Sequence, residues 1–195
     1  HGVLLIADEV ITAFGRTGAW TGSRLWDVKP DFMTTAKAIT NGYYPFGAVM
    51  IAEQVVDTFE SNEDSFGAVF HGYTYSAHPL ACAAGIATLD VYRDDDLFAR
   101  AAELAPYFES ALHSLSDANN VIDVRNLGMM GAIELDPIPN KPTSRAMEAF
   151  QKAFDAGLLI RTTGDTIALS PPLIIEKKQV DFIADTVRSV LKTIH

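Results

Sequence analysis

One continuous apolar run that ends in two carboxylates limits the fold of this chain more than any other feature of its sequence. Residues 3–7 are all apolar, and Asp8 and Glu9 follow them directly. An apolar run of this length without alternation is typical of a strand buried on both faces, as in a parallel sheet. We therefore predict an α/β sheet in which Asp8 lies at the carboxyl end of a strand, the edge where such sheets bind ligands.

The remaining segments divide the chain into two parts. Residues 1–93 are predicted to complete an α/β domain, and residues 94–195 are predicted to form a small α+β domain. Pro79 favours a helix start and Gly157 favours a helix end. The expected helices cover residues 53–59, 80–92, 97–115, 144–156 and 177–194, and the expected strands cover residues 3–7, 47–52, 121–125, 130–135, 158–161 and 166–169. In the second of the long helices, apolar residues recur at helical spacing at Leu97, Ala101, Leu104, Phe108 and Leu112.

Composition and charge exclude several classes of protein. The chain of 195 residues is 48% hydrophobic and 21% charged, which is typical of a soluble globular protein. No apolar run approaches the ~20 residues of a membrane helix, and the formal net charge of −10 disfavours nucleic-acid binding. Cys82 is the single cysteine, so an internal disulfide is excluded and a cytoplasmic location is expected. The first residues lack the features of a signal peptide, and we interpret the sequence as part of a longer polypeptide.

Two charged residues are candidates for catalysis. Asp8, at the end of a buried strand, needs a partner such as the cationic ring nitrogen of a cofactor. Lys37 has only small or apolar neighbours, and the next lysine along the chain is Lys141. Apolar surroundings favour the neutral amine that bonds covalently to a carbonyl group. The alternatives are an ordinary aspartate in a turn and a solvated lysine on an edge element.

The segment of residues 71–79 is a candidate phosphate site. Hydroxyl side chains lie just before the predicted helix start, where backbone N–H groups without helical partners suit a phosphate. The alternative is that Ser76 caps the helix and Gly72 forms a turn. Motifs of P-loop, dinucleotide-binding, zinc-protease and serine-hydrolase sites are absent from the sequence. The five histidines lack metal-ligand spacing, so no metal site is expected.

Four motifs occur in a specific order. They are Ala7-Asp8-Glu9-Val10, Phe14-Gly15-Arg16-Thr17-Gly18, Ala36-Lys37-Ala38 and Tyr73-Thr74-Tyr75-Ser76-Ala77-His78-Pro79. Together they resemble the class III aminotransferases, and most of all the ω-amino acid–pyruvate (β-alanine–pyruvate) transaminases. The similarity covers nearly the whole chain. It implies a fold-type-I enzyme dependent on pyridoxal 5′-phosphate (PLP), in which residues 1–93 are the end of the large cofactor domain, with a mixed, mostly parallel sheet, and residues 94–195 are the small C-terminal α+β domain.

The resemblance also implies a role for each candidate residue. Asp8 would pair with the protonated ring nitrogen of PLP, and Val10 would pack against the face of the ring. Lys37 would bond to the cofactor, be displaced by the substrate amine, and then carry a proton between substrate and cofactor. Thr74 would bind the cofactor phosphate across a dimer interface. Arg161 would bind the substrate carboxylate through its planar guanidinium, unless it is an ordinary surface arginine at a strand end.

The implied function is transamination between an amine or ω-amino acid and a keto acid such as pyruvate, in a homodimer or higher oligomer. Family members are much longer, and their N-terminal half supplies a phosphate-binding loop and the aromatic residue stacked on the cofactor ring. The chain is therefore expected either to work with a missing N-terminal segment or to be an incomplete, non-catalytic fragment. Ala13 also stands where this branch usually has glycine. Another class III PLP enzyme, namely a decarboxylase, aminomutase or racemase, is the remaining alternative.

Overall fold

The chain forms two compact units in a computed structural model that describes residues 1–61 and 71–194. The first unit contains His1–Gly15 and Ala19–Phe98. The second unit contains Ala99–His195 together with the short segment Arg16–Gly18. Residues 62–70 and residue 195 lie outside the described residues.

A mixed sheet of three strands forms the centre of the first unit. Its strands are β1 (Ile6–Asp8), β2 (Phe32–Thr35) and β3 (Ala48–Ile51), in the order β1-β2-β3. β1 runs parallel to β2, with Asp8 opposite Thr34, and β3 runs antiparallel to β2. The expected mixed α/β sheet is therefore confirmed, and Asp8 is the last residue of its strand.

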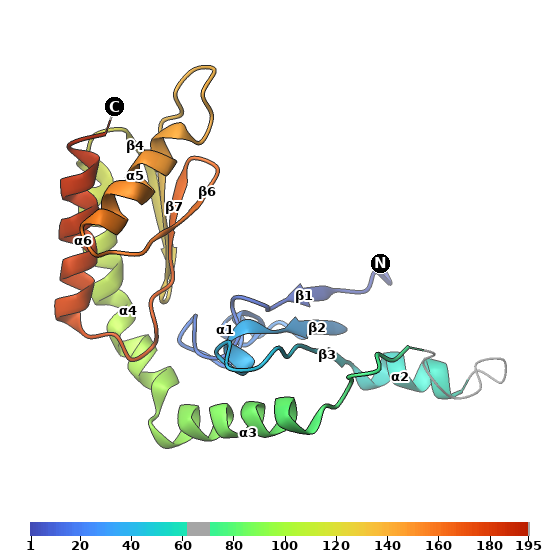
Figure 1. Cartoon of the computed structure of the whole chain (residues 1–195). Helices are drawn as coiled ribbons and strands as arrows, with labels where there is room; N and C mark the ends of the chain where they lie inside the picture. The colour runs from blue at the N-terminus through green and yellow to red at the C-terminus, as the bar shows by residue number, and fades with distance from the viewer. Residues whose placement is uncertain (62–70, 195) are drawn as a thin grey trace. The chain divides into compact units, whose positions relative to one another are not determined.

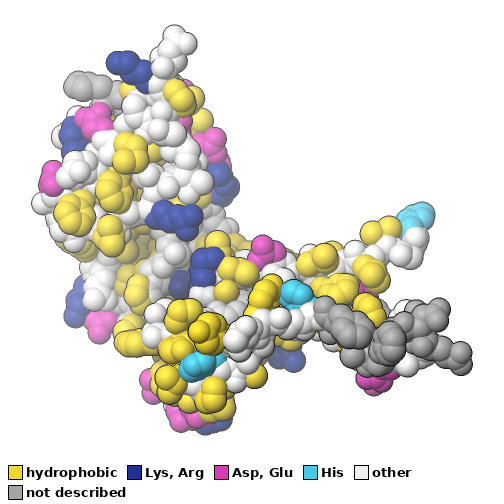
Figure 2. Space-filling model, turned by 45° about the vertical axis from the view of Figure 1, so that its right-hand side comes forward, with side chains coloured by type: hydrophobic (Ala, Val, Ile, Leu, Met, Phe, Trp, Pro, Cys, Tyr) yellow, Lys and Arg dark blue, Asp and Glu magenta, His cyan; other side chains and the backbone are white. Residues whose placement is uncertain are grey.

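The prediction that residues 3–7 form a strand buried on both faces is wrong for the described chain. Only Ile6–Asp8 is a strand, and the side chains of Val3 and Ile6 are 84% and 65% exposed. β1 is an edge strand in this sheet, so none of the described strands pairs with its outer side. Figure 2 shows hydrophobic side chains at the surface of this unit. An exposed apolar strand at a sheet edge is a surface that other polypeptide segments can cover.

Short and long helices complete the first unit. They are α1 (Gly22–Leu25), the 3₁₀ helix η1 (Lys37–Ile39), α2 (Glu53–Glu60) and α3 (Pro79–Asp94). The predicted start of α3 at Pro79 is confirmed, but Ser76 does not cap this helix. The cap is His78, whose Nδ1 accepts a hydrogen bond from the Leu80 amide at 3.2 Å, while the Ser76 hydroxyl accepts one from the Tyr73 amide at 3.1 Å.

The second unit is an antiparallel sheet with helices beside it (Figure 1). The strands β4 (Val121–Leu127), β5 (Met130–Leu135), β6 (Arg161–Thr163) and β7 (Thr166–Leu169) lie in the order β4-β5-β7-β6, and the helices are α4 (Leu97–His113), η3 (Ser114–Asp117), α5 (Ser144–Asp155) and α6 (Lys177–Leu191). None of the described helices has the length and apolar character that a membrane crossing requires. The predicted α+β composition of this part is confirmed.

One strand of the second unit begins later than predicted. Residues 158–161 were expected to be extended, but β6 starts only at Arg161. The Gly157 amide donates to the Phe154 carbonyl at 2.9 Å, and the Leu158 amide donates to the Ala153 carbonyl at 2.8 Å. These two bonds form a helix-ending Schellman motif, so the Leu158 amide closes the end of α5 instead of pairing in the sheet. The predicted helix end at Gly157 is confirmed, and its backbone is left-handed, with φ of +84°.

The apolar face predicted for α4 is confirmed by its burial. Each of its five members is at most 8% exposed: Leu97, Ala101, Leu104, Phe108 and Leu112. α4 lies directly against β5, because a Cβ added at Gly131 would approach Leu112 Cδ2 to 2.1 Å and Phe108 Cε1 to 3.3 Å. The absence of a side chain at Gly131 therefore allows the helix to pack closely on the sheet.

Candidate functional site

Asp8 and Lys37 start from the same edge of the sheet in the first unit. Asp8 ends β1, and the hydroxyl of its register partner Thr34 lies 3.4 Å from the Asp8 Oδ1 atom. Lys37 follows Thr34 by three residues and begins η1, directly beyond the end of β2. Because β1 and β2 are parallel, their carboxyl ends share one edge, and this edge carries an acid and an amine. Both side chains are exposed.

The Asp8 carboxylate has one oxygen oriented by the protein. Its Oδ1 atom accepts a hydrogen bond from the Val10 amide at 3.1 Å in addition to the contact with Thr34. Within the described part of the chain, both hydrogen bonds of this side chain fall on Oδ1, so Oδ2 can accept from a further donor. Val10 is half-buried beside it. An oriented carboxylate beside an apolar side chain suits a cationic aromatic ring.

Glu9 holds the loop that follows β1. Whereas Asp8 is exposed, Glu9 is only 3% exposed. It accepts hydrogen bonds from the Gly22 amide at 2.9 Å, from the Ser23 amide at 2.6 Å, and from the hydroxyls of Ser23 and Thr12. Burial by itself raises the pKa of the Glu9 carboxyl, but the hydrogen bonds from Ser23, Thr12 and Gly22 outweigh burial and lower the pKa below its ordinary value. Glu9 therefore ties residues 10–22 to the end of β1 as a charged acceptor.

The lowered pKa of Glu9 predicts a loss of stability in acid. Because the folded-state pKa lies below the ordinary value of 4.5, the stabilisation from Glu9 is complete above that pH. It is lost as the pH falls through the folded-state pKa, where the carboxyl must take up a proton. We expect Glu9→Gln to lower the unfolding free energy by about 1–3 kcal/mol at pH 7, with a difference from the parent that shrinks below pH 4.5.

Urea titrations at several pH values would measure this difference. Glu103→Gln removes one carboxylate from the exposed face of α4 and is the matched control. A constant difference between Glu9→Gln and the parent protein from pH 7 to pH 3.5 would contradict a pH-dependent contribution from Glu9.

Lys37 has a backbone conformation that is uncommon for a residue with a side chain. Its φ is +47°, in the left-handed region, and Asn41 and Gly42 follow with φ of +49° and +79°. The Thr40 amide closes η1 by donating to the Lys37 carbonyl at 3.3 Å. Left-handed backbone at a non-glycine residue is concentrated at functional sites, because the surrounding structure must hold it there.

Thr74 lies on a turn that precedes α3. The Ser76 amide donates to the Tyr73 carbonyl at 3.0 Å, and Ala77 has a φ of +56°. The Thr74 side chain is exposed, and the neighbouring Tyr73 and Tyr75 are 73% and 80% exposed. Among the described residues, no hydrogen bond joins this turn to Asp8 or Lys37. The structure therefore places Thr74 in the same unit as the acid and the amine but does not bring it into contact with them.

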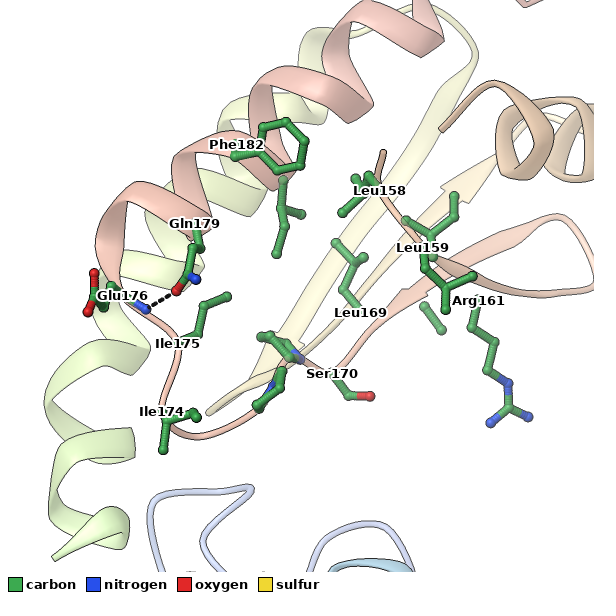
Figure 3. A pocket seen from close by; sticks show the side chains of 15 residues that line it. Leu158, Leu159, Arg161, Leu169, Ser170, Ile174, Ile175, Glu176, Gln179 and Phe182 are labelled. Atoms are coloured by element: carbon green, nitrogen blue, oxygen red, sulfur yellow. Dashed lines mark hydrogen bonds between the residues drawn. The ribbon is translucent and has the colours of Figure 1, made fainter. Parts of the chain in front are cut away.

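Arg161 lies at the mouth of an apolar groove in the second unit. It is the first residue of the edge strand β6 and is paired with Ala168. The groove has a volume of about 770 Å³, and its lining includes Leu159, Leu169 and Phe182. Figure 3 shows the Arg161 guanidinium directed away from these apolar side chains. The exposed guanidinium is therefore available to an anion, such as a carboxylate.

Arg16 makes contacts that could not be predicted from the sequence. Its Nη1 atom donates to the Pro171 carbonyl and lies 3.4 Å from the Met129 carbonyl. The Met129 amide in turn donates to the Arg16 carbonyl at 2.9 Å. The Phe-Gly-Arg-Thr-Gly motif marked Arg16 as a residue of interest in the sequence. The motif could not identify its partners, because they lie more than 110 residues away in sequence.

Comparison with known sequences identifies relatives of the whole chain. A family model described as aminotransferase class III matches residues 1–191. The chain is 56% identical over 191 residues to an omega-aminotransferase of Caulobacter vibrioides. The aligned region covers 98% of this chain and 44% of that protein. It is 46% identical over 196 residues to a beta-alanine–pyruvate aminotransferase of Pseudomonas aeruginosa, covering 100% of this chain and 44% of that protein. The chain thus spans less than half the length of these curated relatives.

Comparison with solved structures gives the same result for the fold. An amine transaminase from an uncultivated Pseudomonas species, in its PLP-bound form, superposes with a TM-score of 0.93 at 36% identity. This match covers 100% of this chain and 46% of that chain. An omega transaminase from Pseudomonas jessenii in complex with PMP gives a TM-score of 0.90 at 30% identity, covering 97% of this chain and 43% of that chain.

Proposed function

The chain belongs to the class III aminotransferase family, and from this premise we propose that it is the C-terminal part of a PLP-dependent transaminase. The proposed reaction moves an amino group from an amine or ω-amino acid to a keto acid such as pyruvate. The observation that carries the proposal is the pairing of β1 with β2, which sets Asp8 and Lys37 at one edge of a parallel pair. The fold-type-I structures that superpose on the chain support it.

The donor set at this edge fits PLP. When bound, this cofactor supplies a cationic ring that takes up the electrons released when a C–H bond breaks at the substrate carbon that carries the amino group. The Asp8 carboxylate, with Oδ1 oriented by Val10 and Thr34, offers the negative charge that keeps a ring nitrogen protonated. Val10 offers an apolar surface for a ring face. In this proposal Lys37 would hold the cofactor through its amine and, after a substrate amine displaces it, would move a proton at the substrate carbon that carries the amino group.

Two further residues have separate proposed binding roles. The exposed guanidinium of Arg161 is suited to a bidentate contact with the substrate carboxylate. Thr74 is proposed to bind the cofactor phosphate of a second copy of the protein in a homodimer. The exposure of Tyr73 and Tyr75 on either side of Thr74 supports this role, because exposed aromatic side chains are typical of contact surfaces.

A companion segment is part of the proposal. Val3 and Leu4, which precede β1, and Ile6, its first residue, expose apolar side chains, and the outer edge of β1 lacks a partner in the described sheet. The relatives are more than twice as long as the matched region. We infer that a preceding segment covers this edge and supplies the remaining groups of the cofactor site. The named relatives carry out amino transfer, which favours this reaction over decarboxylation, amino migration or racemisation.

An amino-transfer assay tests the proposed function. The chain joined to its preceding segment, incubated with PLP, β-alanine or another amine, and pyruvate, is expected to form alanine. Carbon dioxide release without alanine would favour a decarboxylase. Tight PLP binding without amino transfer to any keto acid would reject the transaminase assignment.

Arg161→Gln is expected to weaken the binding of the keto acid. Loss of a charge-assisted contact worth about 1.5–3 kcal/mol raises KM for pyruvate by about 10–100-fold, with a smaller change in kcat. The control is Arg125→Gln, which removes an exposed arginine from β4 at the other edge of the same sheet. An unchanged KM for pyruvate in Arg161→Gln would show that another group binds the carboxylate.

A further inference from the structure

The buried tyrosine of α3 contacts the backbone next to Lys37. Tyr92 is 5% exposed, and its hydroxyl donates a hydrogen bond to the Ala38 carbonyl at 2.6 Å. The same hydroxyl oxygen accepts one from the Asn41 side-chain amide at 2.8 Å. We propose that Tyr92 is a positioning residue for Lys37, holding the left-handed backbone from which the lysine side chain projects. This inference rests on the proposed role of Lys37 in binding PLP.

The backbone around Lys37 needs such a restraint. Lys37 and Asn41 both have positive φ, and the side chain of each makes this conformation less favourable than it is for glycine. A single 3₁₀ turn with the Thr40–Lys37 hydrogen bond is a weak support, because 3₁₀ hydrogen bonds have poor geometry. The Tyr92 hydroxyl contacts both ends of the segment, at Ala38 and at Asn41, and therefore fixes the path of the chain between them.

Tyr92 is itself held on a rigid element. Its ring is stacked on Phe14 with centroids 6.2 Å apart and lies 5.2 Å from the ring of Phe98. The body of α3 is close to the same segment, because a Cβ at Gly85 would lie 3.1 Å from Phe46 Cε1 and 3.8 Å from the Ile39 carbonyl oxygen. The helix therefore acts as a fixed support from which the Tyr92 hydroxyl reaches the carbonyl beside Lys37.

In this proposal Tyr92 positions Lys37 and takes no part in the chemical steps itself. Tyr92 hydrogen-bonds to Ala38 and Asn41, so it acts on the reaction only through the direction in which the Lys37 amine is presented. A misdirected amine reacts and transfers protons more slowly, although the substrate still binds. The expected signature is therefore a loss in kcat with little change in KM, together with altered absorption of the cofactor bound at Lys37.

Tyr92→Phe in the full-length holoenzyme tests the proposal, since it removes one hydroxyl and keeps the packed ring. We expect kcat to fall by about 10–100-fold with KM nearly unchanged, and the visible absorption band of the bound cofactor to shift. In the apoprotein, amide hydrogen exchange is expected to become faster across residues 38–41. Tyr107→Phe is the matched control, because it removes a tyrosine hydroxyl that donates to Asp181 Oδ1 at 2.6 Å on the exposed face of the second unit.

A second variant keeps the test decisive if Tyr92→Phe folds poorly. Asn41→Gly permits the left-handed backbone without strain and removes the side chain whose amide contacts Tyr92. We expect Asn41→Gly to change kcat, the absorption band and the exchange rate in the same direction as Tyr92→Phe, with smaller changes in all three. Parent-like values of all three in both variants would overturn the positioning role while leaving PLP binding and amino transfer by the parent intact. Failure of the parent itself to bind PLP would instead reject the proposed function.

Discussion

Lys37→Ala is expected to abolish the visible absorption band of the bound cofactor and to lower kcat by about 10²–10⁴-fold. The reason is that one amine has two tasks in the proposed site, covalent attachment of PLP and proton transfer at the substrate carbon that carries the amino group. The fold should survive, because the Lys37 side chain is exposed and alanine removes no buried contact. Absorption spectra of the purified holoenzyme and single-turnover reaction with an amine measure the two effects separately.

Lys29→Ala is the matched control for this variant. Lys29 is also an exposed lysine of the first unit, but it precedes β2 at the amino end of the strand, whereas Lys37 follows the carboxyl end. Its replacement should leave the spectrum and kcat as they are in the parent. A parent-like absorption band in Lys37→Ala, or loss of the band in Lys29→Ala, would place the cofactor elsewhere.

Gly128→Ala is expected to cause a large loss of stability. Gly128 lies in the turn between β4 and β5 with φ of +53°, and a Cβ there would lie 2.7 Å from the Arg16 carbonyl oxygen and 2.8 Å from Thr17 Cα. Both are backbone atoms, so neither can rotate away. Overpacking costs about 1–3 kcal/mol, and a left-handed backbone at alanine adds about 1–2 kcal/mol. The displaced carbonyl is also the acceptor for the Met129 amide, so that hydrogen bond is expected to weaken.

Urea unfolding of Gly128→Ala and Gly164→Ala separates the close contact from the backbone cost. Gly164 has a similar φ of +58°, but a Cβ there meets no atom within 4 Å. Gly164→Ala should therefore lose only the unfolding free energy that a left-handed backbone at alanine costs, about 1–2 kcal/mol. Equal losses in the two variants would mean that the contact with Arg16 and Thr17 contributes nothing, and that this loop segment is not held tightly against the β4–β5 turn.

Local signals in the sequence were sufficient for most of the secondary structure. The apolar spacing along α4 identified its buried face because a helix places those residues on one side. Pro79 and Gly157 marked helix ends because each has a backbone property that acts locally. Asp8 was identified as a strand-end carboxylate because it directly follows an apolar run, and the end of such a run is visible in the sequence.

Other features depend on partners that are distant in the sequence. The exposure of Ile6 in β1 depends on which other segments cover the faces of the sheet, which no pattern within residues 3–7 specifies. The contact of Tyr92 with Ala38 joins residues 54 positions apart, and that of Arg16 with Pro171 joins residues 155 positions apart. His78 replaced Ser76 as the helix cap because a ring nitrogen can accept the same hydrogen bond as a hydroxyl. Composition and periodicity report the apolar faces of elements but not the tertiary hydrogen bonds between them.

Reduction of the holoenzyme with borohydride, followed by mass spectrometry of its peptides, identifies the lysine that is bonded to the cofactor. Borohydride makes the bond between a lysine nitrogen and the cofactor carbon permanent, so the modified residue can be identified. We expect a phosphopyridoxyl group on Lys37, the lysine that shares a sheet edge with Asp8. A phosphopyridoxyl group on any other lysine, or an unmodified Lys37 in a protein that retains PLP, would contradict this expectation.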